Sequence, residues 1–116
     1  MQVKVVMHLD WDQMDALEMG IGNIRNLLKD VPADQADVRF VANGKAVALF
    51  RKDRSGEHQA GMRELAAQGV RFCLCRNALA KQNLAAADLV EGCEVIPAGI
   101  VELIRLQQEG FAYIKP

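Results

Sequence analysis

Hydrophobic positions along the chain switch between short β-branched runs and longer stretches with helical spacing. Residues 3–9 are almost continuously apolar, interrupted only by Lys4 and His8, which is typical of a strand buried on both faces. In residues 14–28, apolar side chains recur at steps of three and four, which predicts an amphipathic helix that ends before Pro32. Asp10, Asp12 or Asp15 is available as its N-cap.

The same reading continues to the end of the chain, with turns marked by Asn43-Gly44 and by single glycines. Four further strands are expected at residues 36–42, 70–75, 93–96 and 111–114. Helices are expected at residues 46–50, 62–66, 76–82, 83–90 and 100–106, with Asn77 as a capping residue of the third. Strands and helices that alternate over short connections predict an α/β fold, a three-layer α/β/α sandwich with a mainly parallel five-stranded sheet. We expect residues 1–116 to form a single domain, since the chain has only 116 residues.

Composition and charge argue against nucleic-acid-binding, membrane-spanning and secreted proteins. Hydrophobic residues make up 51% of the chain and charged residues 25%, with a net charge of −1, so no basic field exists to attract nucleic acid. No apolar run approaches the roughly 18–20 residues that cross a membrane, and the first residues do not resemble a signal peptide. Three cysteines, an odd number, are typical of free thiols in a reducing compartment. These features favour a cytoplasmic protein.

Ligands of parallel α/β sheets bind beyond the carboxyl ends of the strands, because loops and helix N-termini meet there. This rule selects residues at the ends of the first four predicted strands. They are His8, Asp10, Trp11, Asn43, Gly44, Cys75, Arg76, Asn77, Pro97, Ala98 and Gly99. Cys75 is the best nucleophile among them, since it ends a strand and begins a helix whose positive end favours the thiolate. Cys73 should share its face of the strand one pleat deeper, and Cys93 should lie at the opposite end of the sheet.

A structural role for these residues competes with this interpretation. Free cysteine is often a small buried hydrophobic residue, and His8 could be a satisfied core residue, while His58 is expected to be solvated. No metal site is expected, because the Cys73–Cys75 pair has no second pair of ligands at suitable spacing. No cofactor is expected either, since no glycine-rich phosphate-binding loop follows a strand.

Several segments together resemble the DsrE/DsrF-like family. They are residues 70–79, 92–103 and 106–116, with His8, residues 23–28 and residues 41–44 in the first half. The resemblance covers essentially the whole chain. It implies a small α/β/α domain that assembles into homo-oligomers, commonly trimers or hexamers. In the sulfur-relay branch of the family, a cysteine at the end of the third strand carries sulfur as a persulfide, and Cys75 occupies the matching place.

Two functional hypotheses follow. In the first, the protein is a sulfur carrier or sulfurtransferase-like protein that uses a persulfide on Cys75 and exchanges sulfur with a protein donor and a protein acceptor. Arg76 and Asn77 would then stabilise the sulfur anion, while the pocket would be walled by His8, Asn43, Gly44 and Gly99. In the second, the protein is a non-catalytic oligomer that binds a small ligand, and Cys75 is merely packed. The reactivity of the cysteine separates the two.

Overall fold

A computed structural model describes residues 2–54 and 56–116 of the protein. In this part of the chain, five strands form one sheet in the order β4-β3-β2-β1-β5, and each pairing between neighbours is parallel. The strands are β1 (Val3–Leu9), β2 (Ala36–Ala42), β3 (Arg71–Cys75), β4 (Cys93–Ile96) and β5 (Ala112–Ile114). The helices are α1 (Met14–Asp30), α2 (Gly56–Ala67), α3 (Arg76–Lys81) and α4 (Gly99–Gln108), with 3₁₀ turns η1 (Ala33–Gln35), η2 (Gly44–Phe50) and η3 (Ala86–Asp88).

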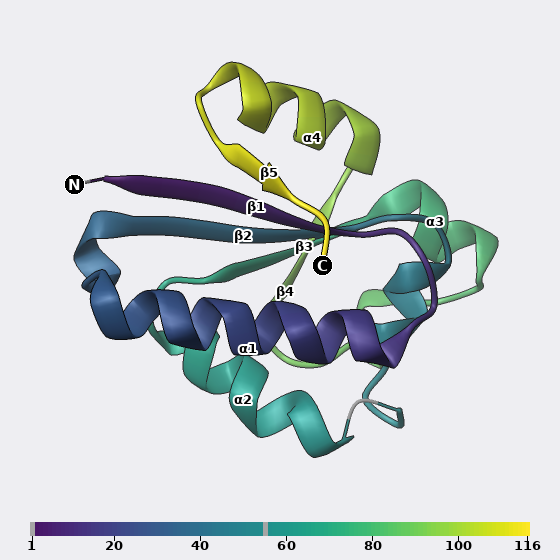
Figure 1. Ribbon diagram of the computed structural model, residues 1–116. Helices are drawn as coiled ribbons and strands as arrows, with labels where there is room; N and C mark the ends of the chain where they lie inside the picture. Colours follow the sequence, from purple (N-terminus) through teal and green to yellow (C-terminus); the bar gives the residue numbers. More distant parts are fainter. Residues whose placement is uncertain (1, 55) are drawn as a thin grey trace.

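The helices cover both faces of the sheet. Figure 1 shows α1 and α2 on one side of the strands and α4 on the other, with α3 beyond the ends of the strands. The three-layer α/β/α prediction is therefore confirmed, and the sheet is parallel throughout rather than only mainly so. Strands that are covered on both sides need apolar side chains on both sides, which explains the nearly continuous apolar runs in the sequence.

Side chains that alternate between the two faces of the sheet form two separate hydrophobic clusters. Met7, Phe40 and Phe72 belong to the larger cluster, which includes the buried side chains of α1 and α2. The rings of Phe40 and Phe72 stack with their centroids 4.9 Å apart. The smaller cluster lies under α4 and joins six buried side chains. They are Val6, Val41, Cys73, Leu103, Leu106 and Phe111.

One predicted helix is wrong. Residues 83–90 were expected to be helical, but only η3 forms there, as a single 3₁₀ turn. Asn83 adopts a φ of 54°, which ends the preceding helix. The residues after η3 are extended and form hydrogen bonds with a distant part of the chain. Leu89 bridges Arg51, and the Val90 amide donates to the Phe50 carbonyl at 2.8 Å. Tertiary contacts thus override the alanine-rich composition of this segment.

Two predicted caps are also wrong. The N-cap of α1 is Gln13 rather than an aspartate, and its side chain makes no capping hydrogen bond. Asn77 lies inside α3, whose N-cap is Cys75. The residue that caps a helix depends on where the backbone leaves its extended conformation, which sequence spacing locates only to within one or two residues.

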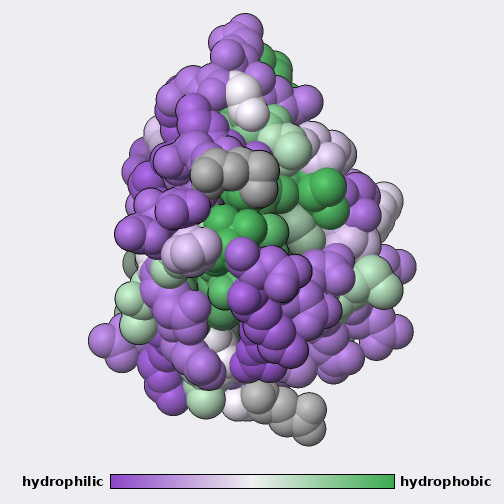
Figure 2. Space-filling view, turned by 60° about the vertical axis from the view of Figure 1, so that its left-hand side comes forward, coloured by the Kyte–Doolittle hydropathy of each residue, from purple (hydrophilic) through white to green (hydrophobic). Residues whose placement is uncertain are grey.

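The sides of the molecule differ in polarity. A groove of about 330 Å³ runs between α1 and the sheet edge, with Val5, Ile24, Leu27 and Ile114 among its lining residues. Figure 2 turns the left-hand side of Figure 1 forward and shows hydrophobic side chains gathered in a hollow of a mostly hydrophilic face. In the described part of the chain, no helix is long and apolar enough to cross a membrane.

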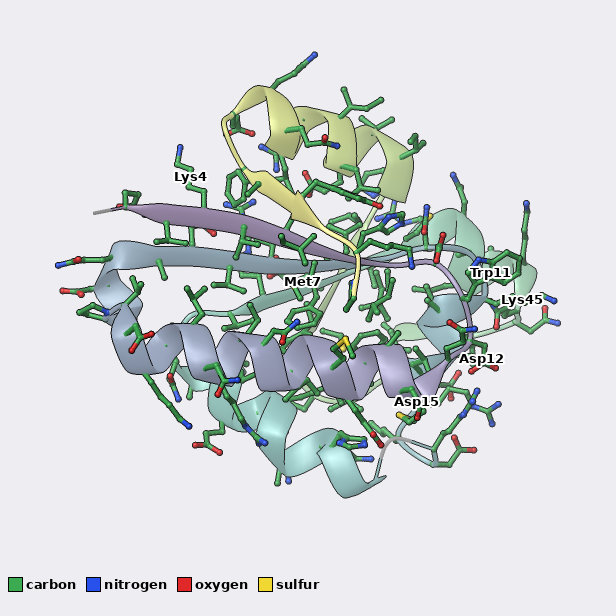
Figure 3. All side chains as sticks on the ribbon, viewed as in Figure 1. Lys4, Met7, Trp11, Asp12, Asp15 and Lys45 are labelled. Carbon is green, nitrogen blue, oxygen red and sulfur yellow. The ribbon has the colours of Figure 1, made fainter. Side chains whose placement is uncertain are left out.

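Strand register determines which residues meet at the carboxyl end of the sheet. Leu9 pairs with Ala42, Ala42 with Leu74, and Leu74 with Val95, so these four residues form one row across the sheet. Beyond this row Cys75 still pairs with Ile96, while Asp10 and Asn43 are the first residues after β1 and β2. Figure 3 shows Trp11, Asp12 and Lys45 at this end of the molecule and Lys4 toward the other.

Candidate functional site at the carboxyl end of the sheet

Cys75 stands where β3 becomes α3. It is the last residue of the strand, pairs with Ile96 of β4, and is also the N-cap of the helix. Its exposed fraction is 6%, whereas that of Cys73 is zero. The residue before Cys75, Leu74, pairs with Ala42, the last residue of β2 before the loop that starts at Asn43. The thiol therefore belongs to a residue at the junction of a strand, a helix and a loop.

The other two cysteines are in different surroundings. Cys73 packs under α4, whereas Cys75 packs with the larger cluster that includes Ala78 and Leu79 of α3. The expectation that Cys73 and Cys75 share one environment is therefore not met, because the chain turns out of the strand at Cys75. Cys93 pairs with Phe72 near the start of β3, so it lies toward the opposite end of the sheet, as expected.

Burial suppresses the reactivity of these two thiols. Burial raises the pKa of Cys73 to about 11, with the Glu94 carboxylate adding to the effect and Arg71 opposing it. Burial also raises the pKa of Cys93 to about 12. Since the thiolate is the nucleophilic form, both groups stay protonated and weakly reactive at neutral pH.

His8 links the ends of three strands. Its Nε2 lies 2.9 Å from Oδ1 of Asn43, and its Nδ1 lies 2.5 Å from the hydroxyl of Tyr113 on β5. The imidazole is half-buried, and its centroid lies 5.5 Å from that of the Tyr113 ring. His8 is thus a partnered residue at the edge of the core, and its two hydrogen bonds join β1, β5 and the loop after β2.

Two glycines allow the loops to approach closely. A Cβ on Gly99, the first residue of α4, would lie 2.8 Å from the Cβ of Asn43. A Cβ on Gly44 would lie 2.9 Å from the carbonyl oxygen of Asp10, and Gly44 also has a φ of +55°. Neither position accommodates a side chain without movement of a neighbouring group. The loops after β1 and β2 and the start of α4 are therefore packed against one another.

The arrangement can be compared with known proteins. The sequence matches the DsrE/DsrF-like family over residues 12–116. This chain belongs to that family.

Solved structures of similar proteins support the fold of this DsrE/DsrF-like chain. A protein of unknown function, MTH1491 from Methanobacterium thermoautotrophicum, has 36% sequence identity, with 99% of this chain and 100% of that chain covered at a TM-score of 0.89. The ychN protein from E. coli shares the fold at 21% identity, with both chains fully covered and a TM-score of 0.80. Among curated proteins, none matches the sequence significantly. The family is associated with sulfur relay in general, and the comparisons assign no specific activity to these neighbours.

The structure of this DsrE/DsrF-like protein brings some predicted site residues together and leaves others apart. His8 forms a hydrogen bond with Asn43, and Asn43 packs against Gly99. Gly44 follows Asn43 and packs against the carbonyl oxygen of Asp10. Arg76 and Asn77 have exposed side chains on α3. The helix is tied to the same loop by Gln82, whose Nε2 donates to the Gly44 carbonyl at 2.9 Å.

Sequence reasoning missed two interactions at this end. Tyr113 was not singled out, although on β5 it pairs with Val6, which lies two residues before His8 on β1. Asp10 forms an ion pair with Lys115 at 2.8 Å. Burial acts to raise the pKa of Asp10, but the hydrogen bond and charge of Lys115, aided by His8, lower it overall. Both interactions depend on β5 lying beside β1. The sequence predicted a strand at residues 111–114 but not the strand with which it pairs.

Other polar groups have local partners. His58 is partly buried and lies 3.2 Å from a Glu18 carboxylate oxygen, so it is less solvated than expected. Among the described residues, no group of three or more His, Cys, Asp and Glu side chains is arranged to hold a metal ion. The candidate site therefore consists of a cysteine, an amide, an imidazole and closely packed backbone.

Proposed function

We propose that this protein is a sulfur carrier in which Cys75 accepts sulfane sulfur as a persulfide and passes it to an acceptor thiol. The observation that carries the proposal is the place of Cys75 at the carboxyl end of β3, where the family's link to sulfur relay gives a strand-end thiol a chemical role. Ligands of parallel α/β proteins gather at this end of the sheet.

A comparison of the three thiols supports Cys75. Cys73 has no exposed surface, and burial holds the pKa values of Cys73 and Cys93 at about 11 and about 12. Sulfur transfer requires a thiolate that can reach its donor. Cys93 is more exposed than Cys75, but its raised pKa keeps it protonated at neutral pH. Cys75 is 6% exposed and adjoins the exposed side chain of Arg76 at the start of α3, so we place the reaction there.

The proposed step is a balanced thiol–persulfide exchange. The Cys75 thiolate attacks the outer sulfur of a donor persulfide, R–S–SH. A bond forms between Sγ and that sulfur while the donor S–S bond breaks, and the electron pair leaves with the donor as R–S⁻. The proton stays on the transferred sulfur, which gives Cys75–S–SH and requires no external oxidant. An acceptor thiolate then takes the outer sulfur in the same way and regenerates the Cys75 thiolate.

The surroundings of Cys75 suit a sulfur anion. In this proposal Asn43, which follows Ala42 at the end of β2, belongs to the wall of the pocket, because an amide NH₂ group can donate a hydrogen bond to a thiolate or persulfide. Arg76 places a cation in the first turn of α3, one residue after the thiol. The partners in this proposal are a protein that donates sulfur and a protein that accepts it.

We also propose that the chain assembles as a homo-oligomer, a trimer or hexamer. The support is an exposed apolar strip on α4, formed by Ile100, Val101 and Ile104, which are 60%, 62% and 48% exposed. We call it the α4 strip. Beside it lies a hollow of about 260 Å³ that includes Ile96 and Pro97. Exposed apolar side chains that cluster in this way are typical of protein–protein contacts.

Mass spectrometry of the protein after brief exposure to limiting polysulfide tests the sulfur-carrier proposal. We expect a mass gain of one sulfur atom on Cys75, which disappears in Cys75→Ser and on addition of an acceptor thiol. Cys93→Ser and Cys73→Ala are the matched controls and should leave the gain unchanged. Equal or negligible labelling of all three cysteines would contradict the proposal and favour a binding protein with an inert thiol.

A further inference from the structure

A cavity of about 490 Å³ lies between α2 and the segment that leads from η3 into β4. We call it the α2 cavity. Its volume falls within the range of about 300–1,000 Å³ that is typical of ligand pockets. None of the described residues that line it belongs to the candidate site around Cys75 and His8. The α2 cavity is therefore a separate place at which a small molecule could bind.

Hydrogen bonds hold the walls of the α2 cavity in place. On one side, the Val90 amide donates to the Phe50 carbonyl at 2.8 Å, and Gly92, with a φ of +94°, leads the chain into β4. On the other side, the Gln59 side chain donates to the Lys52 carbonyl, which ties the loop before α2 to that helix. The cavity thus lies between two segments that are anchored to the rest of the protein.

The lining of the α2 cavity combines two cations with two buried apolar side chains. Lys52 comes from the loop before α2, and Arg63 comes from α2 itself. Both side chains are exposed, and neither forms an ion pair with a described residue. Leu89 and Val90, each 3% exposed, line the same cavity. Glu91 is the one carboxylate among the described lining residues, so the lining carries a net positive charge.

A lining of this kind suits a ligand that is both charged and apolar. An anionic group is attracted by Lys52 and Arg63, while an apolar body packs against Leu89 and Val90 in place of water. An inorganic anion would use only the cations, and a neutral compound would use only the apolar side chains. We propose that the α2 cavity binds a small organic anion, a carboxylate attached to an apolar body. This second site does not involve Cys75 and goes beyond sulfur transfer.

Titration with benzoate, followed by ¹H–¹⁵N NMR, tests the proposal. We expect saturable shifts of the amide signals of Arg63 and of residues 89–93. Neutral benzamide should bind about tenfold more weakly, because it loses two partly exposed ion pairs. Inorganic phosphate, which lacks the apolar body, should fail to displace benzoate at an equal concentration. Equal affinities for benzoate and benzamide, displacement by phosphate, or shifts confined to other parts of the chain would overturn the proposal.

Variants of the charged lining residues test the role of each charge. Lys52→Met and Arg63→Met should each weaken benzoate binding about two- to fivefold, the effect of one partly exposed ion pair. Glu91→Gln should strengthen it by a similar factor, because it removes a like charge. Lys45→Met is the matched control, since Lys45 is exposed but does not line the α2 cavity. An affinity that is unchanged in both Lys52→Met and Arg63→Met would overturn the proposal.

Cys93 is a natural reporter inside the α2 cavity, because it lines the cavity and is partly buried. In the Cys73→Ala/Cys75→Ser variant, where it is the only cysteine, bound benzoate should slow its alkylation by iodoacetamide in proportion to occupancy. An alkylation rate that saturating benzoate leaves unchanged would show that benzoate binds elsewhere and would overturn the proposal. Since this variant lacks Cys75, the result is independent of whether Cys75 carries sulfur, and either claim can fail without the other.

Discussion

Asn43 packs directly on the backbone of Gly99, so closely that a Cβ on this glycine would lie 2.8 Å from the Cβ of Asn43. The contact joins the loop after β2 to the first turn of α4. The Asn43 Cβ is attached to the main chain, so it cannot yield as the tip of a long side chain can. The requirement for glycine at position 99 is therefore one of space rather than of backbone conformation.

Gly99→Ala should destabilise the protein by about 1–3 kcal/mol, the usual cost of inserting a group into a packed site. Urea denaturation measures the change. Gly22→Ala is the matched control, since a Cβ there meets nothing within 4 Å and alanine is the better helix former in the middle of α1. The control should gain about 0.5–1 kcal/mol. Equal effects of the two substitutions would contradict the close contact with Asn43.

The Asp10–Lys115 pair predicts a pH-dependent contribution to stability. Asp10 has a pKa below the ordinary value of 3.8, so its contribution is present above pH ~4 and is lost as pH falls through the lowered pKa. Lys115→Met should therefore cost up to about 1 kcal/mol at neutral pH, a modest amount because water screens this partly exposed pair. The difference should vanish in strong acid.

Urea denaturation of wild type and Lys115→Met across this pH range is the measurement. Lys45→Met serves as the control, because Lys45 is exposed and forms no ion pair within the described ranges. A stability difference for Lys115→Met that stays constant down to the lowest pH would show that the lysine acts through packing rather than through its charge.

The fold could be predicted from the sequence because its elements are short and strongly patterned. The predicted bounds of β1, β2 and β4 agree with the structure, since each apolar run ends at a polar or turn-forming residue. The helix predicted at residues 83–90 is wrong because the conformation of this segment depends on contacts with Arg51 and Phe50, more than thirty positions away in sequence. Local propensity carries no information about such contacts.

The site was accessible to sequence reasoning only in part. The rule that ligands bind at the carboxyl ends of parallel strands selected His8, Asn43 and Gly99, which the structure brings into contact. It could not select Tyr113, because this residue precedes the end of its strand and matters only through the sheet order. The position of β5 at the edge of the sheet, beside β1, places the Tyr113 hydroxyl at His8.

Alkylation of Cys93 should show the pH dependence of a strongly protonated thiol. In the Cys73→Ala/Cys75→Ser variant, Cys93 is the only cysteine left. Burial raises its pKa to about 12, so the thiolate fraction and the alkylation rate should rise about tenfold per pH unit between about pH 7 and 10. Iodoacetamide labelling followed by mass spectrometry measures the rate, while circular dichroism confirms that the fold persists.

The same variant in urea provides the control for Cys93. Once the chain is unfolded, the thiol should have its ordinary pKa near 8.5, and the rate should level off above about pH 9. A folded protein that shows the same plateau would contradict the effect of burial on this thiol. It would also weaken the choice of Cys75 over Cys93 as the sulfur carrier.

The α4 strip predicts the effect of one charge on assembly. Ile104 is 48% exposed next to Ile100 on the same helix face, and an oligomer contact over the strip would bury both. Ile104→Glu would bury a carboxylate in that contact, which is costly without a partner cation. Light scattering should therefore show the wild type as an oligomer and Ile104→Glu as a 12.8 kDa monomer. Met19→Glu, 59% exposed on α1 across the sheet, is the control and should leave the mass unchanged. A wild type that is already monomeric, or an Ile104→Glu variant that still assembles, would show that the α4 strip is not the contact between copies.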